Sequence, residues 1–387
     1  MPRNVRHSLL FCALCLAASV AGAQTADNAA AAKAAPAAQV PWPEPTTSAA
    51  EKMPLAPQSL LLDYVESGKR AIAVGENGMV LLSDDRSQWR QAAQVPTRAT
   101  LTAVTAVGDK VWAVGRDGVI IASGDGGDTW TLQRSDPWRP PNAQSAGDDA
   151  RHGAPLLDVL FTDATHGIAI GAYSLFLETG DGGTTWAPRQ ILAQAAEAKP
   201  ADEGKGGKGE SGKDGEGKSW TFSKEELKIG DEDEPHFNAI ARTSDGSLLI
   251  AAERGSILRS RDAGATWQRG KLPYDGSMFG AIGFDGQRAM VFGLRGHVFE
   301  TEDLGDTWRE IPTATELSLL GGVKLASGGA ALVGANGLVL LRRSGSESFK
   351  AGTVRPSGAL AAILPIEGGA AFVVAGENGV ARYQPKQ

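Results

Sequence analysis

Ser123-Gly124-Asp125-Gly126-Gly127-Asp128-Thr129-Trp130 is the stretch that decides the fold, because its pattern returns along the chain. The pattern is Ser or Thr, any residue, Asp, any residue, Gly, any residue, Thr and Trp. We call it the Asp-box. The full copies are Ser123–Trp130, Thr179–Trp186, Ser260–Trp267 and Thr301–Trp308. Ser83–Trp89 is one residue short, and Arg342–Phe349 has Ser344 for the Asp and Phe349 for the Trp.

The spacing of these copies gives the length of a repeat. The terminal aromatic residues lie at positions 89, 130, 186, 267, 308 and 349, so the unit is about 41 residues with extra residues in its third and fourth copies. A period near 40 residues is typical of a β-propeller, in which each unit forms one small antiparallel sheet.

Each Asp-box is predicted to be a tight turn between two strands. Its Gly supplies a backbone angle that other residues resist, and the Asp and Ser or Thr side chains accept hydrogen bonds from nearby N–H groups. The Trp is expected to bury its ring under the turn. We therefore interpret eight residues as structural: Asp125, Trp130, Asp181, Trp186, Asp262, Trp267, Asp303 and Trp308.

Between the boxes, each unit repeats two short apolar stretches, a Gly-x-x-Gly turn and a third apolar stretch. This order predicts four strands per unit and seven units, with six or eight as alternatives. The fold class is all-β: a seven-bladed β-propeller of four-stranded antiparallel blades with Asp-box turns. The last unit stops after its third strand near Tyr383, and the segment near Trp42 is a candidate for the strand that closes it.

The chain divides into three parts. Residues 1–23 have a basic head, an apolar run and Ala21-Gly22-Ala23, which indicate a signal peptide. Residues 24–57 form an Ala/Pro-rich leader, and residues 58–387 form the propeller. The propeller carries a charged insertion at 194–235, whose Gly, Lys, Glu and Asp composition predicts disorder. A solvated linker and a partner-binding arm are both open for this insertion.

Composition restricts the function. Cys12 and Cys15 both lie in the signal segment, so the mature chain has no disulfide, thiolate metal site or cysteine nucleophile. Loss of Arg3 and Arg6 leaves 36 of the 38 basic residues against 45 acidic ones, a net charge of about −9. This balance argues against nucleic acid as a partner. No later stretch has the length of a membrane helix, so direct membrane insertion is not expected.

The Gly-x-x-Gly turns lie on one face of the disc, together with the crossovers between blades, and the Asp-boxes lie on the other. Polar residues at the centres of these turns are therefore candidates for partner binding: Arg116, Asp117, Tyr173, Arg254, Arg295, Asn336 and Asn378. Three arginines on an acidic protein suit a carboxylate-bearing partner. The alternative is that they are solvated turn residues.

Catalytic and metal-binding patterns were not found. His152, His166, His236 and His297 lack metal-ligand spacing, and no nucleophile elbow or phosphate-binding loop occurs. We expect no enzyme activity, no metal and no cofactor.

The Asp-box repeat resembles that of the bacterial neuraminidase repeat superfamily. The longer unit, from Val-Gly-x-x-Gly through the Asp-box, resembles the photosystem II assembly and stability factor family and its bacterial relatives, with Val114–Trp130 and Ile170–Trp186 as the best matches. The resemblance covers roughly residues 58–387. It implies an exported, non-catalytic propeller that acts as a scaffold or assembly factor for a membrane or envelope complex through an arginine-rich face.

Two other functions remain open. One is a glycan- or ligand-binding propeller, and the other is a sialidase-like glycoside hydrolase, for which Tyr173 would be the nucleophile. The expected partner is a protein. The expected location is the periplasm, with secretion as the alternative.

Overall fold

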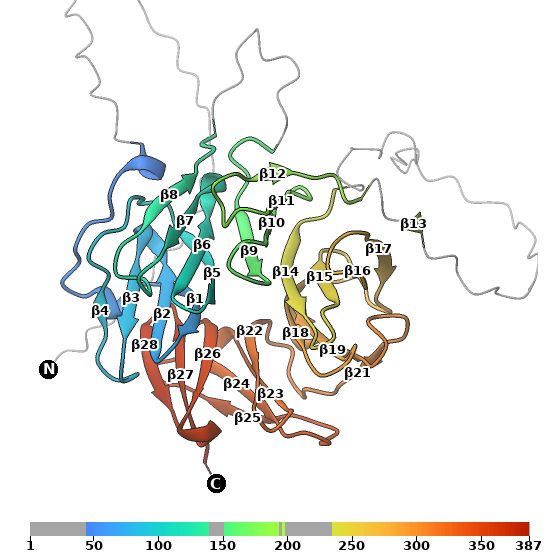
Figure 1. Cartoon of the computed structure of the whole chain (residues 1–387). Coiled ribbons are helices and arrows are strands. Elements are labelled where there is room, and N and C mark those ends of the chain that lie inside the picture. The colour runs from blue at the N-terminus through green and yellow to red at the C-terminus, as the bar shows by residue number, and fades with distance from the viewer. Residues whose placement is uncertain (1–43, 139–150, 193–195, 198–233, 387) are drawn as a thin grey trace, which may run out of the picture. The chain divides into compact units, whose positions relative to one another are not determined.

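A computed structural model describes residues 44–138, 151–192, 196–197 and 234–386 (Figure 1). The signal peptide at 1–23, Trp42 and most of the charged insertion at 194–235 lie outside these residues, so those predictions stay open. Within the described residues the elements are strands and short 3-10 turns, and no α-helix is present. None of the helical turns found there has the length and apolar character needed to cross a membrane.

The structure confirms the predicted seven-bladed propeller. Each blade is an antiparallel sheet whose strands follow the order of the chain. Blade 1 contains β1 (Leu61–Ser67), β2 (Arg70–Gly75), β3 (Val80–Ser83) and β4 (Arg90–Gln91). Blade 2 contains β5 (Leu101–Val107), β6 (Lys110–Gly115), β7 (Ile120–Ser123) and β8 (Thr131–Arg134). Blade 3 contains β9 (Leu156–Phe161), β10 (Gly167–Gly171), β11 (Phe176–Thr179) and β12 (Ala187–Pro188).

The remaining blades continue the pattern. Blade 4 contains β14 (Phe237–Arg242), β15 (Leu248–Ala252), β16 (Ser256–Ser260) and β17 (Gln268–Lys271), and β13 (Ala196–Glu197) from the insertion pairs with β17 in parallel. Blade 5 contains β18 (Met278–Gly283), β19 (Ala289–Gly293), β20 (Val298–Thr301) and β21 (Arg309–Glu310). Blade 6 contains β22 (Leu319–Lys324), β23 (Ala330–Gly334), β24 (Leu338–Arg342) and β25 (Lys350–Thr353). Blade 7 contains β26 (Leu360–Ile366), β27 (Ala371–Gly376) and β28 (Gly379–Tyr383).

Seven 3-10 turns accompany the strands, and most of them lie between the second and third strands of a blade. They are η1 (Pro45–Thr47), η2 (Ala56–Gln58), η3 (Glu76–Gly78), η4 (Arg116–Gly118), η5 (Leu294–Gly296), η6 (Ala335–Gly337) and η7 (Glu367–Gly369).

The Asp-box of blade 2 shows why its residue types recur. Ser123 Oγ accepts the N–H of Gly127 at 2.9 Å and donates to Asp125 Oδ1 at 2.7 Å. Asp125 then accepts the N–H of Thr129 at 3.0 Å and its hydroxyl at 2.6 Å. Trp130 donates from its indole nitrogen to the carbonyl of Gly127 at 2.8 Å. The turn therefore satisfies its own polar groups and directs the ring into the protein.

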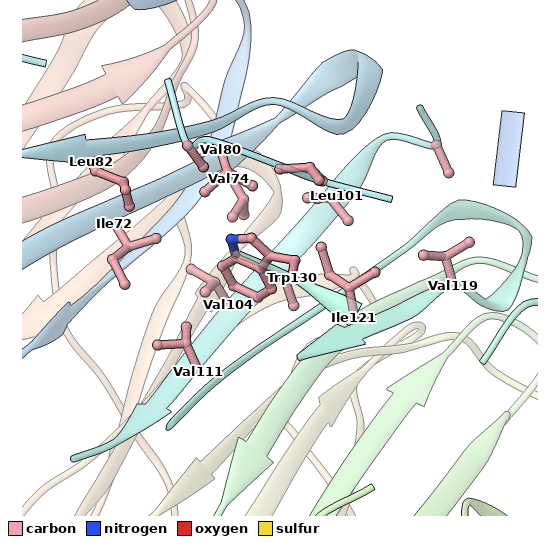
Figure 2. Packing of buried hydrophobic residues seen from close by; sticks show 14 residues of the cluster. Ile72, Val74, Val80, Leu82, Leu101, Val104, Val111, Val119, Ile121 and Trp130 are labelled. Carbon is pink, nitrogen blue, oxygen red and sulfur yellow. The ribbon is translucent and has the colours of Figure 1, made fainter. Parts of the chain in front are cut away.

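The aromatic residue of each box packs between its own blade and the preceding one. Trp130, only 3% exposed, lies among Ile72, Val80 and Leu82 of blade 1 and Val111 and Ile121 of blade 2 (Figure 2). The other boxes do the same: Trp89 lies between blades 7 and 1, Trp186 between 2 and 3, Trp267 between 3 and 4, Trp308 between 4 and 5, and Phe349 between 5 and 6. Hydrophobic burial between consecutive blades therefore holds the ring together.

The described part of the leader packs along the outside of blade 1. The carbonyl of Pro45 accepts the N–H of Arg98 at 2.7 Å, and the carbonyl of Val95 accepts the N–H of Ala50 at 3.0 Å. Blade 7 has three strands within the described residues, and the closing strand proposed near Trp42 lies outside them.

Candidate functional site

The Gly-x-x-Gly turns and the crossovers between blades share one face of the propeller, which we call the Gly-turn face. Its turns are residues 75–78, 115–118, 171–174, 252–255, 293–296, 334–337 and 376–379. The first residue of a turn is Gly in every blade except blade 4, which has Ala252. In blade 2 close packing favours Gly, because a Cβ on Gly115 would overlap the carbonyl of Thr100, just before the first strand of the same blade. The turns are therefore held rigidly against the crossovers.

The second central residue of most of these turns has a left-handed backbone. The φ angles are 54° at Asn77, 55° at Asp117, 57° at Asn336, 55° at Tyr173, 53° at Arg254 and 55° at Arg295. Asn and Asp adopt this conformation readily, whereas for other non-glycine residues it costs roughly 1–2 kcal/mol of conformational free energy. Tyr173, Arg254 and Arg295 thus occupy positions at which the backbone favours other residue types.

Several acidic residues of this face have a structural role. Glu76, Glu253 and Glu377 stand at the first central position, and each accepts a backbone N–H from the crossover beside it. The donors are Leu60 at 3.1 Å, His236 at 3.2 Å and Ala359 at 2.9 Å. These carboxylates are therefore engaged in fixing the turns.

Arg116, Arg254 and Arg295 differ from most other arginines of the chain. Their side chains are exposed, on blades 2, 4 and 5, and within the described residues no carboxylate pairs with them. By contrast, Arg70 pairs with Asp84 at 2.8 Å and with Asp128 at 2.7 Å. The structure places the three predicted arginines on one face, each at the apex of its own turn.

Tyr173 belongs to a polar cluster that the sequence did not predict. The residue is 40% exposed, and its ring meets the ring of His236 edge to face, with centroids 4.9 Å apart. Its carbonyl accepts from Arg151 Nε at 3.1 Å, and Arg151 pairs with Glu234 at 2.6 Å. Arg151 and Glu234 lie at the ends of the two long insertions, so only their position beside those insertions could have indicated the contact.

The remaining predicted residues lie apart from this cluster. The carbonyl of Asp117 accepts the N–H of Asp136 at 2.9 Å. Asn336 and Asn378 are exposed on blades 6 and 7. Each therefore belongs to a separate part of the Gly-turn face.

The four histidines also remain separate, and each contacts a different carboxylate. The distances are 3.1 Å for His152 with Asp136, 2.8 Å for His166 with Asp163, 3.5 Å for His236 with Glu253 and 2.6 Å for His297 with Glu310. Among the described residues no group of three or more potential ligands could hold a metal ion.

The central channel contains a cavity of about 380 Å³ lined by the first strands of the blades. Asp63 and Asp158 face it at a position where the other blades have Ala or Gly. Asp63 accepts the N–H of Val104 at 2.9 Å, and Asp158 accepts that of Ile240 at 2.8 Å, so each ties its blade to the next. Burial raises the pKa of both carboxyls to about 7, although these hydrogen bonds act to lower it.

Two further side chains tie neighbouring blades near the channel. Thr102 donates to the carbonyl of Leu156 at 2.7 Å, and Asn238 donates to the carbonyl of Met278 at 2.9 Å. No local sequence pattern predicts these bonds, because each partner belongs to another blade.

Comparisons with known proteins agree with the resemblance. A family model described as "Photosynthesis system II assembly factor YCF48" matches residues 147–200. The photosystem II assembly lipoproteins Ycf48 of Prochlorococcus marinus and Synechococcus sp. are 41% and 38% identical over 66 residues. That match spans 17% of this chain and 17% and 18% of those relatives.

Solved structures support the fold over most of the chain. "YCF48 bound to D1 peptide" has a TM-score of 0.58 at 14% identity and covers 88% of this chain and 97% of that one. YCF48 from Cyanidioschyzon merolae has a TM-score of 0.57 at 13% identity, covering 88% and 100%. The WD40 propeller domain of Doa1 has a TM-score of 0.57 at 11% identity, covering 88% and 96%. The chain is thus a β-propeller similar to the photosystem II assembly factor.

Proposed function

We propose that this protein is an exported, non-catalytic scaffold that assists the assembly or stability of a membrane or envelope complex. Its Gly-turn face binds an acidic segment of a protein partner, and Arg116, Arg254 and Arg295 supply the contacts. The observation that carries the proposal is the set of three exposed guanidinium groups without a carboxylate partner in the described residues, on a face where Glu76, Glu253 and Glu377 are engaged in fixing the turns.

The backbone supports the same proposal. Arg254 and Arg295 occupy left-handed positions with φ of 53° and 55°, where Gly or Asn would be less strained. Backbone strain that persists at exposed positions is common at binding sites. Arginine presents a planar set of donors that matches a carboxylate, so acidic side chains or a chain terminus fit this face.

The similar proteins favour a protein partner. Two are named photosystem II assembly lipoproteins, and one solved YCF48 structure is bound to a D1 peptide. For this chain we propose a peptide segment of a membrane complex as the ligand and the periplasm as the location. The predicted signal peptide at 1–23 supports export.

The test is recovery of partners from the native envelope fraction after mild crosslinking. The mature protein is compared with a variant carrying Arg116→Glu, Arg254→Glu and Arg295→Glu. A control with the same change of charge carries Lys69→Glu, Lys110→Glu and Arg269→Glu, at exposed positions away from the Gly-turn face.

We expect a defined membrane-protein partner with the wild type and the control, and its loss with the arginine variant. Equal recovery by all three proteins contradicts the role of the arginines. If none recovers a partner, the scaffold function fails and binding of glycans or sialidase activity becomes the next assay.

A further inference from the structure

Blade 7 departs from the repeat in one place. In the other six blades a fourth strand pairs with the third. An aromatic residue directly before that strand in the sequence fills the space toward the preceding blade. In the described residues β28 has β27 on one side and no strand on the other. Within the described residues no Asp-box aromatic side chain lies at the interface between blades 6 and 7.

A cavity of about 580 Å³ lies at this interface, on the Asp-box face. Leu325, Leu341, Pro365 and Phe372 line its apolar part. The strand register shows that Leu341 corresponds to Leu82 and Phe372 to Val111. Leu82 and Val111 belong to the cluster around Trp130 (Figure 2), and Leu82 lies against Gly127 of the box turn, so the cavity lies on the side of the interface that a blade 7 box would cover.

Tyr383 occupies only part of the space that the box aromatic residue fills in the other blades. It pairs with Phe372 as Ser123 pairs with Val111, so it stands at the first position of an absent box. Its hydroxyl lies against Gly352 of β25, at the position that corresponds to Ala92 beside Trp130. The cavity remains open beyond this ring.

The outer edge of β28 presents backbone N–H and C=O groups of the kind that pair with a fourth strand in the other blades. In blade 1 the carbonyl of Val80 accepts the N–H of Ala92 across the outer edge of β3. Val380 corresponds to Val80, so Val380 and, two residues on, Arg382 direct their backbone groups to the outer edge of β28. η2 packs against the start of β28 beside Gly379 and Val380, so the part of this edge that can pair with an added extended chain is the part around Arg382.

The charges at the cavity select the type of chain. Arg343 and Lys386 line it, and no acidic residue does. Arg342 is already paired with Glu300 at 3.0 Å, so Arg343 and Lys386 are the cations that face an incoming ligand. An acidic segment fits this surface better than a neutral or basic one.

We propose that the edge of β28 and the adjoining cavity are a second binding site, for an extended acidic segment of a protein partner that carries a Trp or Phe. The segment adds to β28 as a fourth, antiparallel strand, and its aromatic side chain enters the cavity between Leu341 and Phe372. The site is on the face opposite the arginine turns, so it does not depend on the function proposed for them.

The first experiment measures binding of a fluorescein-labelled peptide with the sequence of residues 301–311, which is acidic and contains Trp308. The protein is the full mature chain, and fluorescence anisotropy gives the affinity. The same peptide with Ala in place of the Trp tests the cavity. We expect the Ala peptide to bind at least about tenfold more weakly than the Trp peptide, because the loss of one modest contact lowers affinity by about that factor.

Two variants at one position test strand addition. Arg382→Pro removes an outward N–H from an edge strand, where proline is tolerated, and Arg382→Ala keeps that N–H while losing the same exposed ion pair with Glu367. We expect Arg382→Pro to weaken binding by about tenfold and Arg382→Ala by less than about threefold. The double variant Arg343→Glu with Lys386→Glu should weaken peptide binding more at low salt than at high salt, because salt screens interactions between exposed charges.

A photoreactive group at the Trp308 position of the peptide supplies a readout that needs no variant. Crosslinks to Leu341 or Phe372 are expected. Crosslinks confined to the Gly-turn face, equal binding to both Arg382 variants, or no binding by the mature chain would overturn the proposal. The last outcome includes the case in which another segment of the same chain already fills the edge.

Discussion

The interface between blades 1 and 2 and the interface between blades 6 and 7 are built from equivalent strands but are filled differently. Between blades 1 and 2, Trp130 closes the space and donates a hydrogen bond to its own turn. Between blades 6 and 7, Tyr383 reaches across from the third strand and a cavity of about 580 Å³ remains. The comparison shows that the repeat specifies the fold, while its exceptions identify the places where the packing between blades differs.

The largest expected effect comes from emptying the filled interface. Trp130→Ala removes a side chain that is 3% exposed between two blades and should lower the free energy of unfolding by about 3–5 kcal/mol. Tyr383→Ala is the matched change at the other interface and should cost no more than about 2 kcal/mol, because the ring is half-buried beside an existing cavity. Urea unfolding monitored by circular dichroism measures both, and equal losses would contradict the difference between the interfaces.

Blade 6 is joined to blade 5 in a third way, because its box begins with Arg342 in place of Ser or Thr. The guanidinium donates to the carbonyl of Ser346 at 2.7 Å and pairs with the buried Glu300 of blade 5 at 3.0 Å. Arg309 also pairs with Glu300, at 2.8 Å. An ion pair between blades therefore replaces the internal hydrogen bonds of a regular box.

We expect Arg342→Ser to destabilise the protein by about 2–4 kcal/mol even though it restores the residue type of the other boxes, because Glu300 then loses a buried partner. Glu300→Gln should cost a similar amount. The double variant should cost less than the sum of the two, which a double-mutant cycle of unfolding free energies measures. Additive losses would mean that the two side chains act independently.

The smallest effects concern pH and separate the carboxylates of the channel from those of the Asp-boxes. The pKa of Asp63 and Asp158 is raised to about 7 by burial, so between pH 4 and 7 the folded chain holds more protons than the unfolded one, and stability falls as pH rises. Hydrogen bonds from the N–H and the hydroxyl of Thr185 lower the pKa of Asp181 to about 2. This box therefore contributes stability above pH 4 that is lost as pH falls toward 2.

Asp63→Asn combined with Asp158→Asn should flatten the stability profile between pH 4 and 7 and improve stability at pH 8 relative to pH 5 by about 1–2 kcal/mol. Asp181→Asn should change only the acidic limb. Thermal unfolding across pH 3–8 distinguishes the two limbs. An unchanged slope above pH 4 in the double variant would assign that slope to other groups.

The sequence predicted the parts of the molecule that repeat. The Asp-box and the Gly-x-x-Gly turn are local patterns, so their spacing was sufficient to predict seven blades. The contact of Arg342 with Glu300 could not be predicted, because its partner lies 42 positions away on another blade. Asp63 and Asp158 could not be predicted for the same reason. Each is a single polar residue in an apolar stretch of sequence, and only the closed ring places it in the channel.

The candidate site was predictable only as a set of turn positions. Topology placed Arg116, Arg254 and Arg295 on one face, but the absence of a carboxylate beside them in the described residues required the folded chain. Their role in binding stays a prediction, as does the role of the leader near Trp42.

Trp89 helps to join the first and last blades of the ring. It packs between blades 7 and 1, where Tyr64 also donates to the carbonyl of Val373 at 3.2 Å, so the two ends of the propeller are joined by a filled interface. Within the described residues the first and last blades share no strand, so packing and hydrogen bonding between side chains and backbone close the ring at this point.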